Sequence, residues 1–104
     1  MSQFAILIES HEARSGVAGN PIVTEAGTKF WVTKDHEGWV EATSTRVTDE
    51  WPPFDIKIFP SQEKAEEFAK KWSGHPWWVK PRAYEIVEVR PRLKQIVCGY
   101  ERVK

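Results

Sequence analysis

The sequence predicts one α+β domain spanning residues 1–104, with a mainly antiparallel sheet of five or six strands and one helix packed on one face. Three observations predict it. A strand, a capped helix and a strand follow one another in the middle of the chain, a hairpin pattern precedes them, and a nearly continuous apolar run lies near the N-terminus. The expected element order is therefore β–β–β–β–α–β–β, and 104 residues is a usual length for a single domain.

The central block combines both kinds of secondary structure. Phe54–Phe59 alternates as a half-buried strand does, and Ser61 is placed to accept the free N–H groups of a following helix. Gly74 is expected to end that helix, and Tyr84–Arg90 to return to the sheet. The helix has one apolar face at spacings i, i+3, i+4 and i+7, made by Ala65, Phe68, Ala69 and Trp72. A buried Phe68 would make Phe68→Ala cost about 3–5 kcal/mol.

The other segments complete the predicted sheet. His11–Gly27 lacks periodicity and is expected to be a long loop. Turns are expected at Asp35–Gly38, which closes a hairpin, and at Pro91–Leu93. The remaining strands are expected at Gln3–Glu9, in the middle of the sheet, and at Thr28–Lys34, Gly38–Thr43 and Lys94–Val103.

Composition excludes several classes of protein. Fifteen basic residues balance fifteen acidic ones, so the whole molecule has no net attraction to nucleic acid or to anionic lipid. Cys98 is the only cysteine, which excludes an intrachain disulfide. The sequence shows no signal peptide and no apolar run of about 20 residues, so we expect a cytoplasmic protein that does not enter a membrane.

The residues offer no support for a catalytic function. The sequence has no Gly-rich phosphate loop, no Cys-x-x-Cys pair and no nucleophile elbow. The histidines His11, His36 and His75 fall in predicted loops, and their spacing does not make metal ligands converge. We therefore expect no catalytic residue, no metal and no cofactor.

An excess of tryptophan is the feature that points to a binding function. Three of the six tryptophans, Trp51, Trp77 and Trp78, lie in connectors that contain proline. They either cover the ends of the core or serve as anchors for a partner protein, with arginines as a charged rim. On the second interpretation the chain is a non-catalytic protein–protein interaction module with a shallow groove beside the Ser73–Arg82 connector. The expected partner-binding residues are Trp51, Trp77, Trp78, Arg82, Arg90 and Arg92.

Single-stranded nucleic-acid binding is the alternative. From Val79 to the C-terminus the chain has seven basic and three acidic residues, so its last hairpin is basic although the whole chain is neutral. Arg90, Arg92 and Arg102 would then form one positive patch, beside aromatic rings on which bases stack.

The sequence also carries a resemblance. Ile58–Ala69 contains a Phe-x-Ser-x-Glu-x-Ala pattern, it is followed by the strand sequence Tyr84–Val89, and Gly38-Trp39 precedes it. Together these residues resemble a pattern in small uncharacterised bacterial and prophage proteins. The resemblance implies the architecture and a phage or mobile-element origin, and it implies no particular activity.

Overall fold

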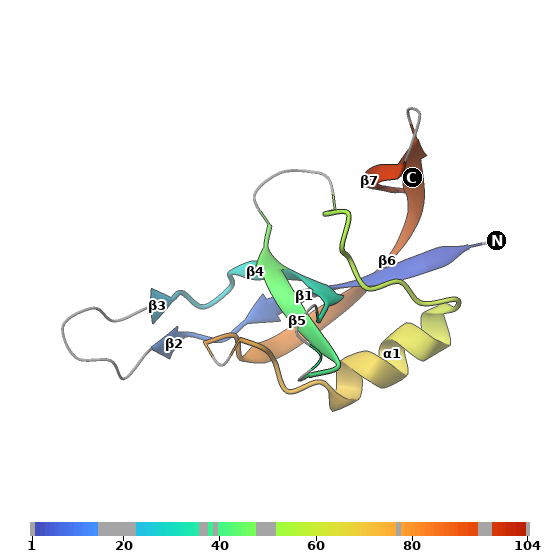
Figure 1. Ribbon diagram of the computed structural model, residues 1–104. Helices are drawn as coiled ribbons and strands as arrows, with labels where there is room; N and C mark the ends of the chain where they lie inside the picture. The colour runs from blue at the N-terminus through green and yellow to red at the C-terminus, as the bar shows by residue number, and fades with distance from the viewer. Residues whose placement is uncertain are drawn as a thin grey trace.

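The computed structural model describes residues 2–14, 23–35, 38, 40–47, 52–76, 78–93 and 97–103, with the backbone alone at 92–93 and 97–98. Figure 1 shows helix α1 beside a twisted sheet. The order in the sheet is β5-β4-β1-β6-β7, a second small sheet pairs β2 with β3, and all pairs are antiparallel. The α+β class is therefore confirmed. The elements are β1 Gln3–Ser10, β2 Ala13–Arg14, β3 Val23–Thr24, β4 Lys29–Lys34, β5 Ala42–Arg46, α1 Gln62–Lys71, β6 Pro81–Leu93 and β7 Val97–Arg102.

β1 is the central strand, as its continuous apolar sequence predicts. It pairs with β4 on one edge and with β6 on the other. Ile6 and Ile8 belong to the core on the helix side of the sheet, while Ala5 and Leu7 belong to a second core on the opposite side. Because neighbouring side chains of a strand point to opposite faces, only an apolar run buries both faces of β1.

The helix forms and docks as its sequence predicts. The Ser61 hydroxyl accepts a hydrogen bond from the Lys64 amide and caps the N-terminus. Ala65 is fully buried, and the helix face packs mainly over β1 and β6. The helix ends at Lys71, earlier than expected, because Trp72 is already extended. Gly74 has a positive φ of 95° in the connector that follows, where it shapes the connector and does not cap the helix.

The predicted strand Phe54–Phe59 is not a regular strand. β1 and β4 diverge and leave a fork between them. Residues 54–59 lie in this fork, where isolated bridges join Phe59 to β1 and Ile56 to β4. Before the fork the chain turns, with the Ile56 amide donating to the Pro53 carbonyl at 3.2 Å. Phe54 lies in that turn with 72% of its surface exposed. The alternating sequence therefore wrongly predicts Phe54 as part of a half-buried strand.

Two hairpins have boundaries that differ from the predicted ones. β5 begins at Ala42, which pairs with Lys34, so the connection is longer than the expected turn and Trp31 faces Thr45. β6 continues through Pro91, where a turn was expected. Proline is tolerated because β1 begins at Gln3, opposite Val89, so the side of Pro91 that lacks an N–H lies beyond the first residue of β1 and faces no partner in that strand.

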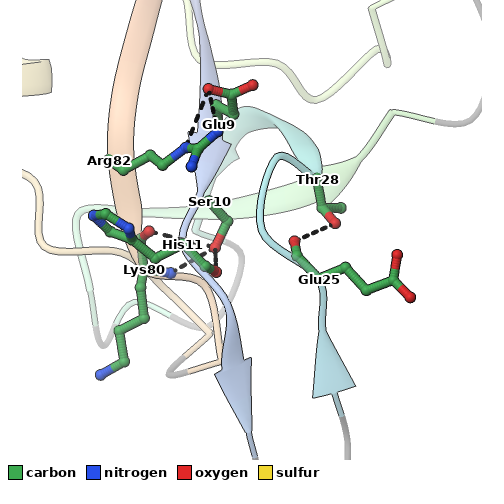
Figure 2. Close-up of polar contacts among 7 residues, drawn as sticks. All are labelled: Glu9, Ser10, His11, Glu25, Thr28, Lys80 and Arg82. Atoms are coloured by element: carbon green, nitrogen blue, oxygen red, sulfur yellow. Dashed lines mark hydrogen bonds and ion pairs between the residues drawn. The ribbon is translucent and has the colours of Figure 1, made fainter.

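The expected loop at residues 11–27 contains the two short paired strands β2 and β3, called the β2–β3 ribbon. Residues 15–22, between these strands, lie outside the described part of the chain. Buried Ser10 anchors its base (Figure 2). The Lys80 amide donates to the Ser10 hydroxyl at 3.0 Å, and the Gly27 amide donates to the Ser10 carbonyl at 2.8 Å. This residue therefore ties the end of β1 to the ribbon and to the connector before β6. Within the described ranges no helix is long and apolar enough to cross a membrane.

Gly74→Ala is expected to destabilise the fold strongly. A Cβ at Gly74 would lie 2.3 Å from the Val79 carbonyl oxygen, in addition to the cost of a positive φ for alanine. We expect about 2–4 kcal/mol in urea unfolding. Gly38→Ala is the matched control, because Gly38 has φ +78° and open space around it, so about 1 kcal/mol is expected. Equal losses in the two variants would show that the Gly74–Val79 approach is not tight.

Candidate functional site

A groove of about 580 Å³ lies between α1 and the start of β5. It forms because α1 packs mainly over β1 and β6 and leaves the helix side of the sheet's β5 edge less covered. One wall is the helix, another is residues 40–42, and residues 73–75 of the connector close one end. A volume of this size is in the range of natural ligand-binding pockets.

The floor of the groove is aromatic. The rings of Phe59 and Phe68 lie 5.3 Å apart between centroids and are tilted by 46°. Trp72 lines the groove next to them, and its indole N–H donates to the Ala42 carbonyl at 3.3 Å. The hydrogen bond fixes the indole against the start of β5, so this apolar floor has a defined shape.

Lysines give the groove its charge. Lys57 Nζ lies 5.2 Å from the Phe68 ring centroid and 5.9 Å from that of Phe59, within cation–π range. Lys64 and Lys71 line the helix wall. Within the lining these two lysines balance the carboxylates of Glu41 and Glu67, and Lys57 adds a cation beside the aromatic floor. This arrangement suits an apolar or aromatic side chain that has a carboxylate beside it.

The connector wall is held to the sheet by polar contacts. The Ser44 hydroxyl donates to the His75 carbonyl at 2.7 Å, which joins residue 75 to β5. The Val79 amide donates to the Pro76 carbonyl at 2.9 Å and closes the turn that follows the cis His75–Pro76 bond. The end wall therefore has a fixed position relative to the floor.

The predicted tryptophan anchors stay a prediction. The groove next to residues 73–75 is lined by Trp72, and Trp78 is not among its described lining residues, so a groove built on the predicted anchors is not shown. Trp78 is half-buried and packs against the helix-side core. Trp51 and Trp77 lie outside the described residues.

The predicted arginine rim is engaged with carboxylates. Arg82 pairs with Glu9 at 3.2 Å, Arg90 with Glu101, and Arg102 with Glu85 at 3.5 Å. Arg92 lies in β6, where the backbone alone is described. The prediction that Arg90 and Arg102 belong to one continuous positive patch is wrong. Arg102 pairs with Val89 and Arg90 with Glu101, so the register places these two arginines on opposite faces of the sheet.

Two of the three histidines lie in the described part of the chain. His11 is exposed beside Ser10, His75 lines the groove, and His36 lies outside the described residues. In the part of the chain that the structure describes, no group of three or more His, Cys, Asp or Glu side chains could hold a metal ion.

Sequence reasoning missed two residues of interest. Phe54 is exposed in a turn, and the preceding Pro52-Pro53 pair was the signal that a strand had not yet begun. Lys57 occupies a polar position of the predicted strand, and nothing in the local sequence shows that its ammonium reaches two phenylalanine rings.

Comparison of the chain with protein-family models, with curated proteins and with solved structures finds no match.

Phe68→Ala is expected to cost about 2 kcal/mol in the free energy of unfolding. This is below the 3–5 kcal/mol of a fully buried ring, because Phe68 is half-buried at the groove floor. Phe54→Ala removes the same atoms from an exposed turn, so it should cost less than about 0.5 kcal/mol. If both variants unfold at the same urea concentration, Phe68 does not support the floor.

Proposed function

We propose that this chain is a non-catalytic protein-interaction module that binds a segment of a partner protein in the groove between α1 and β5. The observation that carries the proposal is the aromatic floor under a lysine-bearing wall, in a groove of about 580 Å³. An apolar side chain of the partner would be buried on Phe59, Phe68 and Trp72. Such anchors in desolvated pockets supply most of the binding energy of protein interfaces.

The partner is proposed to be another protein in the cytoplasm. For a chain that resembles small prophage proteins, a phage or host protein is the natural partner. One buried apolar anchor contributes about 2–3 kcal/mol, which is less than a millimolar dissociation constant requires. Binding of useful strength therefore needs further contacts beside the groove.

The described residues favour a protein partner over single-stranded nucleic acid. Nucleic-acid binding needs unpaired cations on one surface. Arg90 and Arg102 lie on different faces, and each has a carboxylate partner.

A titration with labelled oligothymidine at low salt tests this preference. We expect no saturable change in fluorescence anisotropy in about 20 mM NaCl. Binding that weakens linearly with the logarithm of salt concentration would contradict the protein-partner proposal and favour the nucleic-acid alternative.

The groove itself is tested with linear dodecapeptides selected by display on the immobilised chain. A selected peptide should bind the Lys71→Glu variant at least about tenfold more weakly, because Lys71 lines the groove. Lys70→Glu is the matched control, since the neighbouring lysine makes the same charge change in the last helical turn and lies outside the groove lining. A library that yields no binder, or binders equally affected by both variants, would overturn the groove as the binding site.

A further inference from the structure

β6 has a strand on both of its edges along only part of its length. β1 pairs with residues 81–89, whereas β7 pairs with residues 89–93. The Val103 amide extends this second pairing by one bond, to the Glu88 carbonyl at 3.0 Å. Figure 1 accordingly shows β7 beside the last part of β6. Residues 82–87, called the free half of β6, therefore have β1 on one side and no described strand on the other.

The hydrogen bonds at Glu88 show which backbone groups of the free half point away from β1. The Glu88 carbonyl accepts from the end of β7, and Phe4, which lies opposite Glu88, exchanges its two backbone bonds with Phe59. Glu88 therefore directs its backbone groups away from β1. Because this direction alternates along an antiparallel strand, Tyr84 and Ile86 do the same. No hydrogen bond to another described residue occupies the outward groups of these two residues.

The exposure of the side chains agrees with an uncovered edge. The four consecutive residues 82–85 are all exposed, and Tyr84 keeps 41% of its surface accessible. The free half contains no proline or lysine, and its register with β1 is regular over residues 83–87. Its tyrosine, isoleucine and valine favour extended backbone. An edge without protecting features is a template for pairing with another strand.

We propose that the chain forms a two-fold symmetric dimer, in which the free half of β6 pairs with the free half of a second copy. A strand that joins this edge has to end before it meets β7 and has to carry unpaired backbone groups of its own. A second copy meets both conditions, because its free half has the same length and runs in the opposite direction under two-fold symmetry. The chain has no net charge, so two copies do not repel each other as whole molecules. This edge lies across β1 from β5, so the dimer is independent of the proposed groove.

The side chains of the free half fit a register centred on Tyr84. In that register the tyrosines of the two copies face each other, and aromatic pairs of this kind stabilise sheets. Ala83 of each copy lies opposite Glu85 of the other, so no like charges are opposed. The pairing covers residues 82–86, and the contact of β7 with residue 88 lies outside the paired segment.

The two neighbouring registers are less favourable. A register centred on Glu85 places two carboxylates opposite each other, which destabilises a sheet. A register centred on Ala83 places Ile86 opposite Lys80. The Lys80 amide and carbonyl are already bonded to residues 10–11 at the end of β1, so they are not free to pair with a second copy.

Two lysine substitutions at neighbouring exposed positions test the dimer by sedimentation equilibrium. The wild-type chain should change from monomer to dimer as its concentration rises to about 1 mM. Tyr84→Lys brings two ammonium groups together at the symmetry axis and should raise the dissociation constant of the dimer at least about tenfold. Ala83→Lys adds the same charge opposite Glu85 of the other copy, so it should lower that constant at least about twofold. A wild-type chain that stays monomeric, or an equal effect of the two lysines, would overturn the proposal.

Amide hydrogen exchange of the wild-type chain gives a second readout that needs no substitution. The amides of Glu85 and Val87, which face β1, should be protected at every concentration. Those of Tyr84 and Ile86 should exchange at close to the rate of an unstructured chain in dilute solution and become protected at about 1 mM. Protection of Tyr84 while the chain is monomeric would show that this edge is already covered and would overturn the proposal. The effect of Lys71→Glu on peptide binding does not depend on the dimer, so the proposed function is tested separately.

Discussion

The whole structure depends on β1, which is paired along both edges and buried on both faces. Ala5 and Ile6, adjacent residues on opposite faces, are both fully buried. A strand in this position must be covered on each side by other parts of the chain. α1 covers the helix side, and on the other side Ala5 and Leu7 pack in a second core with Ile56, with Val87 and Val89 of β6 and with Tyr100 of β7. Removal of either cover would expose the continuous apolar sequence of β1 to water.

The groove follows from the way this cover is arranged. One helix of ten residues is about 15 Å long, too small to cover a sheet of five strands, and it lies over the centre of the sheet. The β5 edge is therefore left beside the helix, and the gap between them is lined by aromatic rings from α1 and from residue 59. The connector from Ser73 to His75 closes one end of the gap and is held to β5 through Ser44.

Elements with local signals were predictable from the sequence. The apolar run of β1 and the capped, periodic helix at Ser61 need no knowledge of distant residues. The fork that receives residues 54–59 was not predictable, because it arises from the divergence of two strands far away in sequence. The register of β6 with β7 was not predictable from the sequence either, and this register places Arg90 and Arg102 on opposite faces of the sheet. Aromatic and proline content directed attention to the connector and to Trp51, Trp77 and Trp78, but the groove is lined by Trp72, whose position over the sheet depends on how the helix docks.

The groove between α1 and β5 keeps its shape because the Trp72 indole is bonded to Ala42 and the His75 carbonyl is bonded to the hydroxyls of Thr43 and Ser44. Residue-resolved hydrogen exchange of the free chain tests this most directly, because the indole N–H of Trp72 reports its own hydrogen bond. That N–H should exchange clearly more slowly than an indole N–H in an unstructured chain. Exchange at the unstructured rate would mean that the aromatic floor is not fixed against β5 and would contradict the account.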